Sequence, residues 1–291
     1  MITGDLSGRW FPSRESDADY FCVIGSPIGH SKSPLIHAAF AAQTGRELVY
    51  DRVEVLPSQL AAAVAEFRGI GGRGMNVTVP LKQEAFALAE RRMERAEEAG
   101  AANTLWFDEN GAVVADNTDG SGLMRDLEFN QGIALVGKRV LLIGAGGAAR
   151  AVVPALAAAA PAALVITNRT GHKATAIATA FAQRAAMGAL PWGSDSAEPF
   201  DIVINATSLS LQGELPAISR RCVHAGTVCY DMMYANKPTV FETWARAAGV
   251  AHAFDGLGML VEQAAEAFLD WYSVRPETAA VIAQIRASLA A

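Results

Sequence analysis

The feature that most constrains the fold of this chain is a repeated alternation of short apolar segments with segments whose apolar residues recur at helical spacing. Such an alternation is typical of βαβ units, in which helices connect the strands of a mainly parallel sheet. In the first half we expect strands at 21–24, 48–55 and 75–79, with helices at 34–43, 57–68 and after Pro80. In the second half we expect strands at 140–143, 163–167, 201–205, 227–231 and 250–254, with helices at 147–160 and 258–272. The alternation therefore predicts an α/β fold.

One pair of segments departs from this pattern. The apolar segments 104–107 and 112–115 flank a short polar stretch that ends in Asn110-Gly111. Asn-Gly is the strongest short-range signal for a hairpin turn. We therefore expect one antiparallel hairpin inside the first sheet.

Composition and charge limit the class of protein. At 291 residues, 51% of them hydrophobic, the chain can form two domains with large cores. The formal net charge of −6 argues against nucleic acid or an anionic membrane as a partner. The most apolar stretch, 151–166, contains Pro154 and Pro161 and is too short to cross a bilayer. Residues 1–19 lack the apolar core of a secretory signal.

The cysteines and histidines give no sign of a metal site or a disulfide. The three cysteines form no CxxC pair, and the five histidines are dispersed without zinc-type spacing. We expect Cys22, Cys222 and Cys229 to be free thiols, which suits a reducing cytoplasm. The chain is thus predicted to be cytoplasmic and to bind no metal.

A glycine-rich segment follows the strand predicted at 140–143 and opens a helix. It reads Gly144, Ala145, Gly146, Gly147, Ala148 and Ala149. Glycines in this context let the backbone turn sharply and approach a pyrophosphate, which the amide groups at the helix start stabilise. The segment predicts a dinucleotide site; the plainer alternative is a tight turn in an alanine-rich core.

The end of the next strand indicates which dinucleotide binds. A site for NAD usually has a carboxylate there to hold the ribose 2′-hydroxyl. This chain instead has Asn168, Arg169 and Thr170, followed by Lys173. A guanidinium with hydroxyl and amide neighbours can bind a 2′-phosphate, whereas a carboxylate would repel it. These residues predict NADP, although Arg169 could also be an ordinary surface charge.

Several segments of the first half carry polar side chains suited to a polyhydroxylated ligand. Ser31 and Ser33 lie two residues apart, so in an extended segment their hydroxyls point the same way and can bind a carboxylate. Ser33-Pro34 also fits an ordinary helix N-cap. Asn76, Thr78 and Lys82 follow, then Asn103-Thr104 and the segment 117–120. Amides and hydroxyls can both donate to and accept from sugar-like hydroxyls.

These segments, in this order, resemble the substrate-side motifs of the shikimate dehydrogenases. The segments at 144–149, 168–170, 205–208, 231–238 and 256–263 resemble the cofactor half and the closing segment of the same family. The resemblance extends from Phe21 to about Tyr272. It implies a substrate-binding and catalytic domain at 1–118, completed by helices at 258–291, and a Rossmann-type NADP domain at 119–257. It also implies an active site in the cleft between the domains.

The resemblance further implies reversible, NADPH-dependent reduction of 3-dehydroshikimate to shikimate, a step of aromatic amino acid biosynthesis. Lys82 and Asp119 would be the catalytic pair, and the sequence leaves open which of them titrates as the base. The substrate-binding residues would be Ser31, Ser33, Thr78, Asn103, Tyr234 and Gln263. The cofactor-binding residues would be Gly144, Ala145, Gly146, Gly147, Ala148, Asn168, Arg169, Thr170, Lys173, Thr207, Gly256 and Met259.

The same residues also fit other functions. A quinate/shikimate dehydrogenase with broader substrate or cofactor use would carry much the same residues, and a non-catalytic paralogue would bind nucleotide or metabolite without turnover. A similar enzyme acting on a folate or an amino acid would not explain the paired serines. Members of the family usually have Thr-Ser-x-Gly where this chain has Ser210 as the fourth residue, so we expect a different loop there. The protein is predicted to be a monomer or a homodimer.

Overall fold

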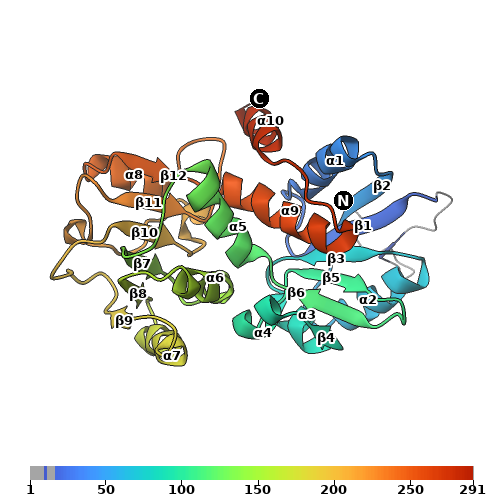
Figure 1. Cartoon of the computed structure of the whole chain (residues 1–291), viewed down its shortest axis with the longest axis horizontal. Helices are drawn as coiled ribbons and strands as arrows, with labels where there is room; N and C mark the ends of the chain where they lie inside the picture. The colour runs from blue at the N-terminus through green and yellow to red at the C-terminus, as the bar shows by residue number, and fades with distance from the viewer. Residues whose placement is uncertain (1–9, 12–16, 291) are drawn as a thin grey trace. The chain divides into compact units, whose positions relative to one another are not determined.

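The computed structural model describes Trp10, Phe11 and residues 17–290. Most of residues 1–19, which were expected not to form a secretory signal, lie outside the described residues. The described residues divide into two compact units (Figure 1). The first contains the residues up to Thr118 together with Gln263–Ile285, and the second contains Asp119–Glu262 and the residues from Arg286 onward. This division differs from the predicted assignment at 258–262 and 286–290, which belong to the second unit.

The first unit contains a six-stranded sheet with strand order β2-β1-β3-β5-β6-β4. β1, β2 and β3 are parallel, with Asp19 opposite Leu48 and Phe21 opposite Gly74. β5 is antiparallel to both β3 and β6, which confirms the predicted hairpin. The strands are β1 Asp19–Gly25, β2 Leu48–Glu54, β3 Gly74–Val77, β4 Arg91–Arg92, β5 Thr104–Phe107 and β6 Val113–Asp116.

The helices of the first unit are α1 Ser33–Thr44, α2 Leu60–Gly69, α3 Lys82–Leu88 and α4 Glu94–Ala99. α2 begins three residues later than the predicted start at residue 57, because Ser58 has φ +70° and cannot be helical. The two faces of β1 belong to two apolar clusters, since alternate side chains of a strand point to opposite faces. Cys22 and Ile24 pack in one cluster, and Phe21 and Val23 pack in the other.

The second unit contains a six-stranded, fully parallel sheet with strand order β12-β11-β10-β7-β8-β9. The strands are β7 Arg139–Ile143, β8 Ala163–Thr167, β9 Met187–Leu190, β10 Ile202–Asn205, β11 Val228–Asp231 and β12 His252–Phe254. The sequence did not predict β9, because the segment has no β-branched residue and contains Gly188. The chain order reverses on the two sides of β7, and ligands of such sheets bind at the carboxyl ends of the strands beside that point.

The helical segments of the second unit are α5 Asp119–Arg125, the π-helix η1 Asp126–Asn130, α6 Gly147–Ala158, α7 Gly171–Phe181, the 3₁₀-helices η2 Leu209–Gln212 and η3 Arg220–Cys222, and α8 Val240–Ala247. α9 Leu257–Tyr272 and α10 Ala279–Ala290 each contribute residues to both units. The architecture confirms the α/β prediction with two domains.

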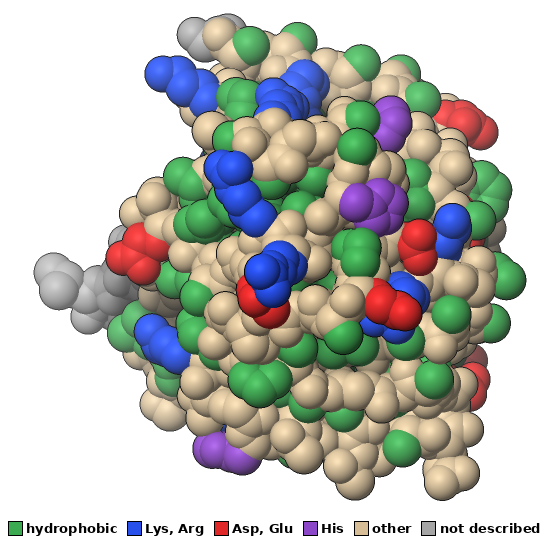
Figure 2. Space-filling view, turned by 90° about the vertical axis from the view of Figure 1, so that its left-hand side faces the viewer, with side chains coloured by type: hydrophobic (Ala, Val, Ile, Leu, Met, Phe, Trp, Pro, Cys, Tyr) green, Lys and Arg blue, Asp and Glu red, His purple; other side chains and the backbone are tan. Residues whose placement is uncertain are grey.

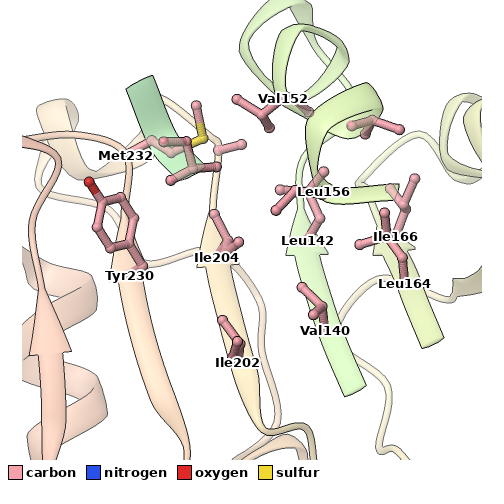
Figure 3. Packing of buried hydrophobic residues seen from close by; sticks show 14 of the residues in the cluster. Val140, Leu142, Val152, Leu156, Leu164, Ile166, Ile202, Ile204, Tyr230 and Met232 are labelled. Atoms are coloured by element: carbon pink, nitrogen blue, oxygen red, sulfur yellow. The ribbon is translucent and has the colours of Figure 1, made fainter. Parts of the chain in front are cut away.

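The core of the second unit fills one face of its sheet. Figure 3 shows side chains of β7, β8, β10 and β11, among them Leu142, Ile204 and Tyr230, together with Val152 and Leu156 of α6. The intervening strand residues, such as Leu141 and Val203, pack in a separate cluster on the other face. A sheet buried on both faces reads as a continuous apolar run, which is why these strands were predictable.

The cysteines, the length of the helices and the surface charges bear on the class of protein. Cys22, Cys222 and Cys229 are buried free thiols, as predicted. Within the described part of the chain, no helix is both long and apolar enough to cross a membrane. On the face drawn in Figure 2, basic and acidic side chains are interspersed with apolar and polar ones.

Candidate active site

The loop between β7 and α6 contains three glycines, of which only the first is required by backbone conformation and close contact. Gly144 has φ +116°, and a Cβ there would lie 3.2 Å from the Ala206 carbonyl oxygen, so this position requires glycine. Gly146 is the N-cap of α6 and Gly147 its first residue, and a Cβ at either would meet nothing within 4 Å. Both are exposed, while the next residue, Ala148, is half-buried. The start of α6 thus has open space around both glycines, and the amide groups of a helix start are suited to bind a pyrophosphate.

Asn168 connects this loop to the end of β8. Its Oδ1 accepts a hydrogen bond from the Ala145 backbone N–H at 3.2 Å, and its Nδ2 donates to the Thr170 carbonyl oxygen at 3.0 Å. Thr170 is the N-cap of α7. The side chain of Asn168 thus holds the glycine loop against the segment that carries the predicted 2′-phosphate ligands.

Two cations lie at the start of α7. Arg169 and Lys173 are exposed, and neither forms an ion pair with another residue of the described chain. The Lys173 backbone N–H donates to the Thr170 carbonyl oxygen at 3.0 Å, so Lys173 lies on the turn that begins at Thr170, the residue after Arg169. Two such cations at a helix start suit a phosphate better than a hydroxyl.

The carboxyl ends of β10 and β12 carry the other predicted cofactor residues. Asn205 Oδ1 accepts from the backbone N–H of Thr207 at 3.1 Å and from its hydroxyl at 2.7 Å, which closes the turn after β10. Gly256 has no room for a side chain, because a Cβ would overlap with the Met232 carbonyl group. Met259 is buried in the second unit's core cluster.

The paired serines lie at the start of α1. Ser31 Oγ donates to Ser33 Oγ at 3.1 Å, so the hydroxyls lie side by side as predicted. Arg52 Nε donates to the Ser31 carbonyl oxygen at 2.7 Å and fixes this segment to β2. The alternative interpretation of Ser33 as the N-cap is wrong, because the N-cap is Lys32, without a side-chain cap bond, and Ser33 is the first helical residue.

A buried hydrogen-bond network joins the serines to the polar residues of β3. Tyr50 Oη donates to Asn76 Oδ1 at 2.6 Å, and the Tyr50 hydroxyl also interacts with the Ser33 side chain. Burial raises the pKa of Tyr50 well above its ordinary value, so the hydroxyl stays protonated and donates. Asn76 Nδ2 in turn donates to Thr104 Oγ1 at 3.3 Å.

The same network continues through Asn103, a predicted substrate ligand that is 2% exposed. Its Nδ2 donates to Thr118 Oγ1 at 2.9 Å and to Gln263 Oε1 at 3.2 Å. Its Oδ1 accepts from the Thr118 backbone N–H at 2.9 Å and from Thr104 Oγ1 at 2.9 Å. Residues far apart in the sequence thus meet in the first unit, including Gln263 from α9.

The remaining predicted residues take the following positions. Lys82 is the first residue of α3 and is half-buried, and Thr78, half-buried, directly follows β3. Asp119 is the first residue of α5 and is 6% exposed. Tyr234 is half-buried in the segment after β11.

The sequence did not single out Tyr50, because a tyrosine in a buried strand usually indicates only packing. The same holds for His37, which stacks on Tyr50 with ring centroids 4.3 Å apart. Burial lowers the pKa of His37 to about 3, so the ring is neutral. Among the described residues, no group of three or more His, Cys, Asp or Glu side chains could hold a metal ion.

Comparison with known proteins agrees with this arrangement. Residues 23–105 match the family model for the shikimate dehydrogenase substrate binding domain, and residues 128–223 match that for shikimate / quinate 5-dehydrogenase. The chain is 53% identical over 269 residues to the shikimate dehydrogenase (NADP(+)) of Alkalilimnicola ehrlichii, covering 92% of this chain and 98% of the relative. It is 52% identical over 274 residues to that of Dechloromonas aromatica, covering 94% and 100%.

A solved structure gives the same picture. The shikimate 5-dehydrogenase of Thermus thermophilus, in complex with NADP(H) and shikimate, superposes with a TM-score of 0.84 at 31% identity. The match covers 93% of this chain and 100% of the Thermus thermophilus chain.

Proposed function

This chain belongs to the shikimate dehydrogenase family and is an NADP-dependent oxidoreductase, and from this premise we propose that Lys82 and Asp119 are its catalytic pair. The reaction is the reversible, NADPH-dependent reduction of 3-dehydroshikimate to shikimate. The observation that carries the site assignment is the network from Ser33 through Tyr50 and Asn76 to Asn103 and Gln263, which unites the predicted substrate segments.

The residues at the end of β7 and β8 fit NADP. Gly144, Ala145, Gly146, Gly147 and Ala148 would hold the pyrophosphate, because the cradle is open where a Cβ would meet nothing. Asn168, Arg169, Thr170 and Lys173 would hold the 2′-phosphate, and Thr207, Gly256 and Met259 would lie beside the nicotinamide. When bound, this cofactor supplies the hydride chemistry.

The residues of the first unit fit a polyhydroxylated carboxylate. Ser31 and Ser33 would donate their adjacent hydroxyls to the carboxylate. Thr78, Asn103 and Gln263 would bind the ring hydroxyls, together with Tyr234 from the second unit. Because Asn103 and Gln263 are already hydrogen-bonded to each other, their orientation is set before the substrate arrives.

The proton has to move with the hydride. Oxidising a secondary alcohol removes the hydroxyl proton, and reducing the ketone returns one to the oxygen. The Lys82 amine can perform both steps when it lies within hydrogen-bond reach of that oxygen, and such catalysis typically contributes about 10²–10⁴-fold. The Asp119 carboxylate would orient the amine.

We also propose that the first unit is the substrate-binding domain and the second the NADP domain. That the reaction takes place in a cleft between the domains stays a prediction. The buried free thiols suit a reducing cytoplasm as the place of action. We expect a monomer or a homodimer, which light scattering of the purified protein would distinguish.

The test is shikimate-dependent reduction of NADP and of NAD, followed by absorbance, with quinate in parallel, for the wild type and Lys82→Ala. We expect activity with shikimate and NADP that is lost in the variant while NADP binding is retained. Comparable efficiency with NAD or quinate would move the assignment to the broader quinate/shikimate class. No turnover with any pair, by a folded protein that binds NADP, would support the non-catalytic alternative.

A further inference from the structure

Asp231 lies at the carboxyl end of β11, where its fully buried carboxylate joins three segments. Its Oδ1 accepts from Asn205 Nδ2 at 3.0 Å and from the Met233 backbone N–H at 3.1 Å. Its Oδ2 accepts from Ser210 Oγ at 2.6 Å. One side chain therefore connects the end of β10, the 3₁₀-helix η2 and the segment after β11.

The residues bonded to Asp231 lead directly to the proposed active-site residues of the second unit. Asn205 holds Thr207 through both its backbone N–H and its hydroxyl. The Met233 carbonyl oxygen accepts from the Gly256 backbone N–H at 3.0 Å, and Tyr234 is the next residue along the chain. The three loops that carry Thr207, Tyr234 and Gly256 thus depend on one set of hydrogen bonds.

Among the residues bonded to Asp231, Ser210 contributes only its side chain, and the backbone conformation at this position would also accept other residues. It lies inside η2, its φ is not positive, and it therefore does not occupy a conformation that demands glycine. Its hydroxyl also accepts from Asn205 Nδ2 at 3.3 Å, so it bridges the amide and the carboxylate. Glycine at this position would leave the backbone acceptable but would remove both bonds.

We propose that Ser210 is a positioning residue for hydride transfer, which acts by holding Asp231 and Asn205 and through them the loops of Thr207 and Tyr234. The proposal rests on the proposed function. Burial raises the pKa of Asp231, while hydrogen bonds from Ser210, Thr239, Met233 and Asn205 oppose that rise. Removing one donor from a buried carboxylate weakens the whole set, because its desolvation is then less well compensated.

The test compares Ser210→Ala, Ser210→Gly and Ser210→Thr with the wild type. The measured quantities are kcat, the KM values for NADP and shikimate, the melting temperature, and the primary isotope effect with shikimate deuterated at the carbon that loses the hydride. We expect kcat to fall roughly 10–100-fold in the Ala and Gly variants, because small errors in the position of reacting groups are costly. The isotope effect should rise, because hydride transfer becomes more rate-limiting, and the Thr variant, which keeps a hydroxyl, should recover most of kcat.

Ser219→Ala is the matched control, because Ser219 Oγ also donates to a carboxylate, that of Asp195, but on the exposed surface. It should match the wild type in kcat and isotope effect. A lower melting temperature with unchanged kinetics in Ser210→Ala would mean that Ser210 is only structural and would overturn the proposal. An inactive wild type would instead overturn the proposed function and this inference with it.

Discussion

Gly258 lies directly against Asp126, so closely that a Cβ on Gly258 would overlap with the Asp126 carboxylate. Asp126 is fully buried, and its Oδ2 accepts from Tyr230 Oη at 2.5 Å. Its Oδ1 accepts from Asn130 Nδ2 at 3.0 Å, so the carboxylate cannot easily move aside. Because Gly258 is the second residue of α9, this contact fixes the start of the helix that carries Met259 and Gln263.

We expect Gly258→Ala to lower the free energy of unfolding by about 1–3 kcal/mol, because overpacking a filled site forces the backbone or Asp126 to shift. The gain of alanine over glycine in helix propensity, at most about 1 kcal/mol, offsets this only in part. Denaturant unfolding monitored by circular dichroism measures the change. Gly171→Ala, at the first position of α7, is the control, since its Cβ would meet nothing within 4 Å. Equal stability of the two variants would show that Asp126 has room to move.

The hydroxyl of Tyr50 gives a second prediction. Tyr50→Phe should reduce the free energy of unfolding by about 1–3 kcal/mol, because Asn76 Oδ1 is left buried without its donor. The KM for shikimate should also rise, because Asn76 and Ser33 lose their common partner. Tyr20→Phe removes a hydroxyl that donates to Asp51 at 2.7 Å on the neighbouring strand β2. It should lose stability without a change in KM; a KM that is unchanged in both variants would contradict a role of Tyr50 in the site.

The strands were largely predictable, and the physical reason is their burial. β8, an apolar run, was predicted with the bounds it has, Ala163–Thr167, since such a run has little alternative to a sheet core. β2 was predicted to within one residue although only Tyr50 and Val53 of it are buried, because it is rich in β-branched and aromatic residues. α8 escaped prediction although Thr239 and Glu242 form a complete capping box, a signal that is readable in the sequence. The π-helix η1 had no such signal.

Site residues were predictable where a motif combines several polar residues. The hydrogen bonds by which a buried residue such as Asp231 positions other residues were not predictable. Asn103 and Gln263 were expected to bind substrate, but their bond to each other depends on tertiary structure. Asp231 belonged to a recognised segment, yet nothing in the sequence shows that its carboxylate is shared by Ser210 and Asn205. Such contacts between strand ends become visible only when the register of the sheet is known.

The exposed cation at the end of β8 gives a third prediction. Arg169→Ala should lower kcat/KM for NADP by about one to two decades and leave that for NAD nearly unchanged, because a charged hydrogen bond to a 2′-phosphate is worth about 1.5–3 kcal/mol. Steady-state kinetics with both cofactors measures the ratio. Arg184→Ala is the control. It removes an exposed arginine that lies over the ring of Phe181, the last residue of α7, and it should not change the ratio of kcat/KM for NADP to that for NAD. Parallel losses with NADP and NAD would mean that Arg169 does not recognise the 2′-phosphate.

A cluster of charges in the first unit gives the last prediction. Arg95 of α4 donates through Nη2 to both carboxylate oxygens of Asp270, each at 3.2 Å, and through Nη1 to Glu266 at 3.1 Å. It also donates through Nε to Asp116 at 3.0 Å, and Arg275 donates to Glu266 at 3.0 Å. The Asp270 side chain is only 15% exposed. Three carboxylates thus share two guanidinium groups around a mostly buried position.

Burial raises the pKa of Asp270 from 3.8 to about 7; Arg95 opposes this rise, while Asp116 and Glu266 add to it. Between these two values the folded protein holds a proton that the unfolded chain has released, so the contribution of Asp270 to stability falls as the pH rises from about 4 to about 7. Asp270→Asn cannot ionise and lacks this decrease. The melting temperature of the variant relative to the wild type should therefore increase from about pH 5 to about pH 8 and then level off, because Asp270 is ionised in both states above its folded pKa. Glu97→Gln, which changes an exposed carboxylate of α4, the helix of Arg95, is the surface control. A difference between Asp270→Asn and wild type that stays constant with pH would show that Arg95 keeps Asp270 ionised throughout.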